Sequence, residues 1–179
     1  RRQRQMCIRD SIDPTCGSGH FLLGAFTRLV QRWEEAAPGM EPRARADKAL
    51  ASVHGVDINP FAVAIAKFRL IVAAMKASGD RDLVNVPKYT LNLATGDSLL
   101  FGPERDGQHA FDPAGGFVDK DAVASGFAYS TEDRERLQSL LTLGQYDVVV
   151  GNPPYITVGD KALNARYRDC LLYTSDAAD

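Results

Sequence analysis

Residues 146–150, which read Tyr-Asp-Val-Val-Val, form a continuous β-branched run that stops at a glycine, an asparagine and two prolines. A run of this kind predicts a strand buried on both faces of a parallel sheet. Two further short runs, residues 52–57 and 89–94, are also predicted to be strands, and each leads to an aspartate. The chain is therefore expected to build a parallel β-sheet.

Helical periodicity predicts helices between these strands. Apolar residues recur at helical spacing from about residue 19 to residue 36. A second helix is expected to begin after Asn59, which can cap it, with Pro60 in its first turn, and to stop near Gly79. One apolar face of this helix comprises Phe61, Ile65, Phe68, Val72 and Met75.

A capping box at Ser130 and Asp133 predicts a further helix that runs to about residue 143. Residues 37–51 form a polar stretch with proline and glycine, and residues 102–129 are interpreted as a long loop or surface insertion. Alternating strands and helices favour a doubly wound α/β sheet with right-handed crossovers. Ligands of such sheets bind beyond the carboxyl ends of the strands.

The two ends of the chain can be encoded by complementary strands of the same DNA sequence. One permitted codon choice for residues 170–179, read as its reverse complement in a shifted frame, translates as RQRQMCIRD, the sequence of residues 2–10. Two unrelated protein termini are not expected to share a coding sequence in this way, and the DNA resembles a transposase-adapter sequence. Residues 1–10 and 170–179 are therefore interpreted as adapter-derived tails, and residues 11–169 as part of a natural protein.

The tails hold four of the 21 basic and three of the 23 acidic residues, so residues 11–169 have a formal net charge of −3. This is not the basic balance of a complete nucleic-acid-binding surface. Cys16 is the one cysteine outside the tails, which argues against a disulfide framework and against a zinc site. No apolar run reaches the length of a membrane span, and a cytoplasmic protein is expected.

The segment from Asp13 to Phe21 contains Gly17 and Gly19 at the start of the first predicted helix. Glycines there let the backbone turn tightly and approach a ligand, and the Asp13 carboxylate can accept a hydrogen bond from an ammonium group. A phosphate loop is disfavoured because no Gly-Lys-Ser/Thr follows. A plain strand-to-helix turn remains the alternative interpretation.

Asp57 and Asp97 each follow a predicted strand. A carboxylate at the position of Asp57 can accept both hydroxyls of a ribose, as acids do in nucleotide-binding sheets. Asp97, in a Gly-Asp-Ser turn, can accept a hydrogen from an adenine amino group. For each aspartate, an ordinary turn residue is the alternative.

Asn152, Pro153, Pro154 and Tyr155 form the most specific motif. Two prolines in succession remove two N–H donors, so that neighbouring carbonyl groups face outward. The Asn152 side chain and the Pro153 carbonyl can then accept both hydrogens of one amino group. Tyr155 offers a ring on which an extruded base can stack.

Other polar residues are assigned structural roles. Cys16 is interpreted as a small buried turn residue and not as a nucleophile. His20 is expected to pack or cap at the start of the first helix. A solvated helix face is predicted for Lys67, Arg69 and Lys76.

Four segments, in this order, resemble the motifs of Rossmann-like amino-methyltransferases that act on DNA adenine. They are DPTCGSGHF at residues 13–21, GVDINPFAVAIAKFRL at residues 55–70, GDSL at residues 96–99 and NPPY at residues 152–155. The first and last are similar to the large methyltransferases of BREX and phage-growth-limitation defence systems. The strand before Asp13 is cut short, and the family's N-terminal helical region and C-terminal target-recognition region are absent, so the piece alone is not expected to methylate DNA.

The resemblance implies a Rossmann-like class I fold, S-adenosylmethionine as cofactor and an adenine flipped out of double-stranded DNA as substrate. It assigns the methionine part of the cofactor to Asp13 and the glycine turn, the ribose to Asp57 and the adenine to Asp97. The other cofactor contacts carried over are Pro14, Cys16, Gly17, Gly19, Phe21, Ile58 and Ser98, and the catalytic residues are Asn152, Pro153, Pro154 and Tyr155. Other defence-system proteins are possible partners, and neither a metal nor a membrane is expected.

Two alternatives remain open at this level. A protein-glutamine or RNA methyltransferase can use the same Asn-Pro-Pro-Tyr motif, because a glutamine amide and a base amino group pose the same geometric problem. The other alternative is a cofactor-binding module that does no chemistry.

Overall fold

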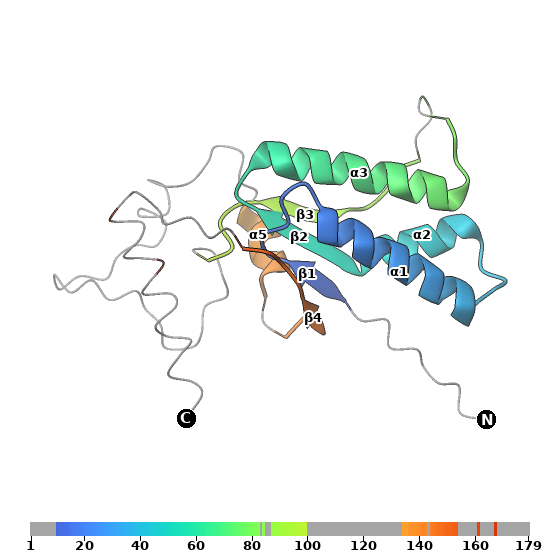
Figure 1. Cartoon of the computed structure of the whole chain (residues 1–179), viewed down its shortest axis with the longest axis horizontal. Coiled ribbons are helices and arrows are strands. Elements are labelled where there is room, and N and C mark those ends of the chain that lie inside the picture. Colours follow the sequence, from blue (N-terminus) through green and yellow to red (C-terminus); the bar gives the residue numbers. More distant parts are fainter. Residues whose placement is uncertain are drawn as a thin grey trace.

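The structure is a computed structural model that describes residues 10–82, 84, 87–99, 134–142, 144–153, 161 and 167. The strands are β1 (Ser11–Asp13), β2 (Val53–Asp57), β3 (Asn92–Thr95) and β4 (Val148–Val149), and the helices are α1 (His20–Ala36), α2 (Pro42–Ala51), α3 (Pro60–Ser78) and α5 (Arg134–Leu140) (Figure 1). All strand pairs are parallel, and the order in the sheet is β3-β2-β1-β4. The predicted parallel α/β sheet is confirmed.

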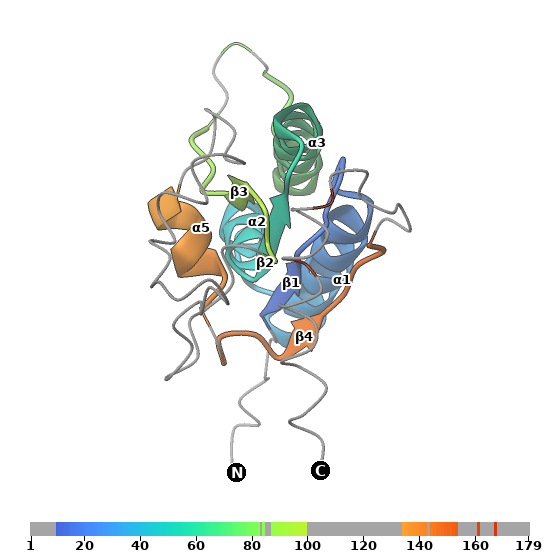
Figure 2. The same ribbon diagram turned by 90° about the vertical axis from the view of Figure 1, so that its left-hand side faces the viewer.

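Helices cover both faces of this sheet. Helices α1, α2 and α3 pack against one another on one face, and α5 lies against β2 and β3 on the opposite face (Figure 2). The side chains of β2 and β3 alternate accordingly, with period two. Val53 and Leu93 point into the core beneath α1 and α3, whereas Val56 and Ala94 pack against α5.

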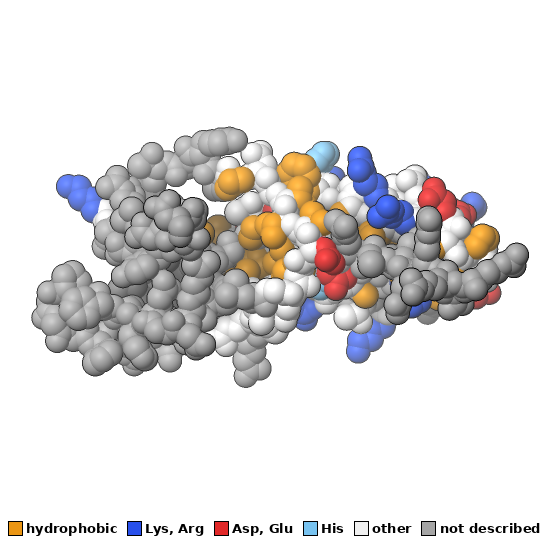
Figure 3. Space-filling view, turned by 90° about the horizontal axis from the view of Figure 1, so that it is seen from below, with side chains coloured by type: hydrophobic (Ala, Val, Ile, Leu, Met, Phe, Trp, Pro, Cys, Tyr) orange, Lys and Arg blue, Asp and Glu red, His pale blue; other side chains and the backbone are white. Residues whose placement is uncertain are grey.

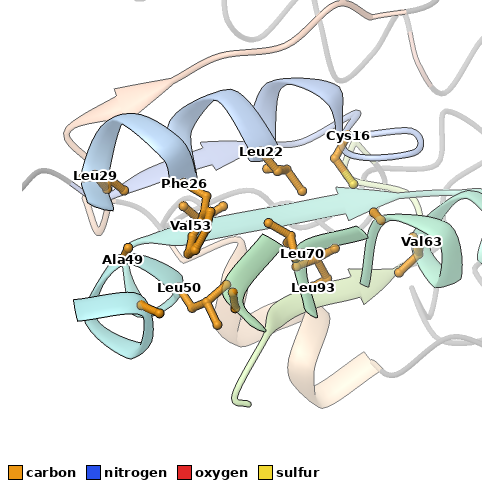
Figure 4. Close-up of a cluster of buried hydrophobic side chains, with 13 residues drawn as sticks. Cys16, Leu22, Phe26, Leu29, Ala49, Leu50, Val53, Val63, Leu70 and Leu93 are labelled. Atoms are coloured by element: carbon orange, nitrogen blue, oxygen red, sulfur yellow. The ribbon is translucent and has the colours of Figure 1, made fainter. Parts of the chain in front are cut away.

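The larger hydrophobic core lies between the sheet and the three helices on its first face (Figure 4). Leu22, Phe26 and Leu29 reach it from α1, and Leu50 from α2. Burying such side chains removes apolar surface from water and stabilises the fold by roughly 1.5–3 kcal/mol for each fully buried residue. The core thereby holds α1 and α3, the two helices next to the strand ends, in fixed positions.

Helix α2 lies within the polar stretch at residues 37–51, where no element was predicted from the sequence. The segment is polar overall, yet its buried side chains are Ala46, Ala49 and Leu50, a narrow stripe of mostly small residues. Pro42 occupies the first turn, where a proline needs no hydrogen-bond partner. This weak apolar stripe, together with a proline in the first turn, could have predicted the helix from the sequence.

Helix α3 begins and ends where the sequence predicts, but a different face is buried. Asn59 caps it by accepting hydrogen bonds from the backbone N–H groups of residues 61 and 62, and Gly79 ends it in the left-handed region. The buried side chains are Val63, Ala66, Leu70, Ala74 and Met75. Of the predicted apolar face, Met75 alone is buried, while Phe61 and Phe68 are 79% and 65% exposed. Small side chains on the buried face let α3 approach its neighbours closely, which phenylalanine would prevent.

Two further predicted elements are shorter in the structure. Strand β3 begins at Asn92 and not at residue 89. The Arg43 guanidinium lies over the Tyr89 ring, with its Cζ atom 3.9 Å from the ring centroid. Helix α5 ends at Leu140, before the predicted residue 143. The proposed capping box, the 102–129 segment and nearly all of the two tails lie outside the described residues.

Strand β4 is the last strand of the sheet, and the prediction that it is buried on both faces is wrong. Val148 and Val149 are 39% and 69% exposed, because β4 pairs with β1 alone in the described sheet. Seen from below, the side on which β4 lies in Figure 1, hydrophobic side chains gather near the middle of the molecule (Figure 3).

None of the helices that the structure describes has the length and apolar character needed to cross a membrane.

Candidate functional site

The parallel arrangement brings every strand-end motif to one edge of the sheet. Asp13 is the last residue of β1 and Asp57 the last residue of β2. Asp97 follows β3 after a glycine, and Asn152 follows β4 after Val150 and Gly151. Carboxyl ends of parallel strands are the usual ligand-binding edge of such sheets.

Asp13 is almost completely buried, with 1% of its surface exposed. Its Oδ1 accepts a hydrogen bond from the Thr15 backbone N–H at 3.0 Å and one from the Thr15 hydroxyl at 3.5 Å. Its Oδ2 is buried and has no hydrogen-bond partner among the described residues. Burial raises the pKa of this carboxyl, and the nearby charge of Asp57 acts in the same direction. An unpaired buried carboxylate oxygen is costly, and a ligand ammonium group would satisfy it.

The glycine turn between β1 and α1 takes conformations that favour glycine. Gly17 and Gly19 have φ angles of 50° and 82°, in the left-handed region. A Cβ on Gly19 would lie 2.9 Å from the Cβ of Ala66, so this glycine lets the turn rest directly on α3. A Cβ on Gly17 would meet nothing within 4 Å, which leaves open space at the turn.

Asp57 connects the turn to the second strand. Its Oδ2 accepts the backbone N–H of Gly17 at 2.7 Å, and its Oδ1 accepts the backbone N–H of Asn59 at 2.9 Å. Each carboxylate oxygen has a second lone pair, so this half-buried group can accept two further hydrogens. The two backbone bonds fix its orientation.

Asp97 is buried at the end of β3. Its Oδ1 accepts the backbone N–H of Leu99 at 2.9 Å, and the Tyr167 hydroxyl donates to its Oδ2. Gly96 precedes it at a position where a Cβ would come within 2.5 Å of the Leu137 side chain. Close packing of this turn on α5 therefore determines where Asp97 lies, and the contact with Tyr167 was not predicted.

The segment after β4 lies against the first aspartate. The Val150 N–H donates to the Ile12 carbonyl at 2.9 Å, which continues the pairing with β1. A Cβ on Gly151 would come within 2.9 Å of Asp13 Oδ1 and 3.1 Å of Thr15 Oγ1. Asn152 and Pro153 follow directly and are exposed. The predicted catalytic segment thus starts beside the buried carboxylate, while Pro154 and Tyr155 lie outside the described residues.

Two comparisons with known proteins indicate the family of the chain. Residues 51–177 match the family model described as Eco57I restriction-modification methylase. The chain belongs to this methylase family. It is also 54% identical, over 160 residues, to the adenine-specific methyltransferase PglX of Streptomyces coelicolor. That match covers 88% of the chain but 13% of the relative, so the chain spans a small part of the relative's length.

Cys16 is buried in the larger core, as expected for a structural turn residue. Burial raises the pKa of its thiol to about 12, which leaves the nucleophilic thiolate unpopulated at neutral pH. Its backbone N–H donates to the Val56 carbonyl at 2.9 Å and so ties the turn to β2. His20 is exposed at the first position of α1, with its ring edge-on to Phe21.

The remaining predicted cofactor residues lie around the same strand ends. Pro14 and Ser98 are half-buried. Phe21, at the start of α1, and Ile58, directly after Asp57, expose large apolar side chains. No group of three or more histidine, cysteine, aspartate or glutamate side chains in the described part of the chain could hold a metal ion.

One residue of the candidate site was misassigned from the sequence. Arg69 was predicted to lie on a solvated face of α3, but it is half-buried and reaches the glycine turn. Its guanidinium donates from Nη1 to the Ser18 carbonyl at 2.8 Å and to the Ser18 hydroxyl at 3.2 Å. Its spacing of three residues from Ala66, the residue beneath Gly19, was the available signal, because such residues share a helix face.

Proposed function

We propose that this chain is part of an enzyme that transfers a methyl group from S-adenosylmethionine to the N6 amino group of adenine in DNA. The observation that carries the proposal is the close approach of Gly151 to Asp13, where a Cβ on the glycine would lie 2.9 Å from Asp13 Oδ1. Through it, the Asn-Pro-Pro-Tyr segment begins beside a buried, incompletely paired carboxylate at the ligand-binding edge of the sheet. Membership of the methylase family supports the same conclusion.

The cofactor would lie along the strand ends, in a Rossmann-like class I fold. Asp13 would accept the ammonium group, Asp57 the ribose hydroxyls and Asp97 the adenine amino group. Gly17 and Gly19 would let the backbone approach the ligand, with the following residues completing the site: Pro14, Cys16, Phe21, Ile58 and Ser98. The unpaired Asp13 oxygen and the open space at Gly17 support this fit. When bound, S-adenosylmethionine supplies an electrophilic methyl group.

The target adenine must leave the duplex to reach the site. Its amino lone pair is delocalised into the ring, which makes the nitrogen a poor nucleophile. The Asn152 side chain and the Pro153 carbonyl would accept both amino hydrogens and so localise the lone pair on nitrogen. Tyr155 would stack on the extruded base, a contact that contributes about 1–3 kcal/mol. Positioning and electrostatics would account for the rate enhancement.

Double-stranded DNA is the proposed partner, in a restriction-modification or phage-defence setting. The family name and the adenine-specific relative support this choice over RNA or protein. Because residues 11–169 carry a net charge of −3, other parts of a longer protein would supply most of the phosphate contacts. We also propose a cytoplasmic location and an adapter origin for residues 1–10 and 170–179.

The test is an assay of the longer protein that contains residues 11–169. It would receive S-adenosylmethionine labelled in the methyl group, together with duplex DNA, RNA and a protein extract in separate reactions. We expect the label in DNA, recovered after digestion as N6-methyladenine. Label in RNA, label on protein glutamine, or cofactor binding without transfer would each overturn the proposal.

A further inference from the structure

Helix α3 contacts the glycine turn and its acidic partner at three separate points. The backbone N–H of Asn59, the N-cap residue, binds Asp57. About two turns further along, Ala66 lies so close to Gly19 that a Cβ on the glycine would come within 2.9 Å of the Ala66 Cβ. Arg69 then reaches over to Ser18 with two hydrogen bonds, at 2.8 and 3.2 Å. A single rigid helix therefore touches the ribose-site acid, the end of the turn and its middle.

The contact from Arg69 completes the fixation of the turn. The Gly17 N–H is held by Asp57 and the Gly19 N–H by the Cys16 carbonyl at 2.8 Å. The Ser18 carbonyl lies between these two points, and the Arg69 guanidinium is its partner. Two glycines in a three-residue turn give the backbone many accessible conformations when nothing holds it. A charged donor makes a stronger hydrogen bond than a neutral one, which suits this position.

We propose that Arg69 is a positioning residue, which holds the turn at residues 17–19 in the conformation that admits the cofactor. This inference rests on the proposed assignment of the turn to S-adenosylmethionine. Arg69 itself need not touch the ligand. Its effect would pass through Ser18 to the peptide groups on either side, in the way that supporting contacts keep a site preorganised.

The variant Arg69→Met tests the proposal, because methionine keeps an apolar stem but donates no hydrogen bond. Arg69→Lys retains the charge and a single donor nitrogen, and Lys67→Met removes a charge from the same helix two residues away. Three quantities would be measured on the 179-residue chain: affinity for S-adenosylhomocysteine by calorimetry, amide hydrogen exchange at residues 16–19, and the thermal unfolding midpoint.

We expect Arg69→Met to weaken cofactor binding about tenfold and to speed exchange in the turn, with the unfolding midpoint nearly unchanged. Arg69→Lys should recover part of both effects, and Lys67→Met should match the parent chain. Unchanged amide exchange and unchanged cofactor affinity in Arg69→Met would overturn the inference. An equal loss of affinity in Lys67→Met, or failure of Arg69→Met to fold, would overturn it too. A parent chain that binds no cofactor would instead overturn the cofactor assignment, while hydrogen exchange would still decide whether Arg69 holds the turn.

Discussion

The backbone N–H of Gly17 donates to Oδ2 of Asp57 at 2.7 Å, across 40 residues of sequence. This bond joins the glycine turn after β1 to the acid at the end of β2, and a second bond from Asn59 orients the same carboxylate. These two bonds preorganise the candidate site. Preorganisation of this kind reduces the ordering cost of binding.

Replacing Asp57 should weaken cofactor binding. We expect Asp57→Ala to cost about 1–3 kcal/mol, since hydrogen bonds to a charged group are lost on both the ligand and the turn. Calorimetry with S-adenosylmethionine measures the change, with Asp47→Ala on the exposed side of α2 as the control. An unchanged dissociation constant would reduce Asp57 to a turn residue.

Replacing Asn152 should separate catalysis from cofactor binding. In the longer protein, Asn152→Ala is expected to abolish methylation while cofactor affinity stays nearly the same, because Asn152 is assigned to the target amino group. Methyl transfer to duplex DNA and calorimetry on the same preparation provide the two readouts. Near-normal turnover would refute the catalytic assignment.

Two glycine-to-alanine substitutions should change the free energy of unfolding in opposite directions. Gly151→Ala forces a Cβ to within 2.9 Å of Asp13 Oδ1, so we expect weaker cofactor binding and a lower free energy of unfolding. Gly24 lies within α1 and has open space around it, so Gly24→Ala should stabilise the chain by about 0.5–1 kcal/mol. Urea unfolding measures both, and a tolerated Gly151→Ala would argue against close contact between these two loops.

The buried Asp13 carboxyl should make the chain less stable as pH rises. Its pKa is raised by burial, so the folded state binds the proton more tightly than the unfolded state does. The free energy of unfolding must then fall as pH rises from the ordinary value of 3.8 through the raised folded pKa.

The variant Asp13→Asn removes this ionisation and retains an oxygen for the Thr15 N–H. We expect it to unfold at a higher temperature than the parent chain at neutral pH, with a difference that shrinks toward about pH 3. Its affinity for S-adenosylmethionine should fall, because the ammonium loses its counter-charge. Thermal unfolding across this pH range measures the first effect, and a constant difference would contradict it.

The two apolar faces of α3 should respond differently to substitution. Leu70 is fully buried, so Leu70→Ala should cost about 2–5 kcal/mol of unfolding free energy. Phe68→Ser, two residues away on the exposed face, should change stability little and reduce binding of a hydrophobic dye. Equal destabilisation by both would show that the exposed face is packed in solution.

The local elements of this protein follow from its sequence, because their signals act over a few residues. Asn59 can cap a helix with its own side chain, Pro60 fits the first turn, and Gly79 accepts the left-handed conformation that ends it. The acids at the ends of β1, β2 and β3 were likewise predictable. Parallel strands carry their carboxyl ends to one edge, so these acids had to gather there.

Tertiary structure decided which surfaces meet. Helix α3 is apolar on two sides, and periodicity does not say which side faces the sheet. The close approach of Gly19 to Ala66 favours the side with small residues and leaves Phe61 and Phe68 outside. The partners of Ser18 and Asp97, namely Arg69 and Tyr167, lie 51 and 70 residues away in sequence. Such pairs depend on packing distances between whole elements, which no local pattern encodes.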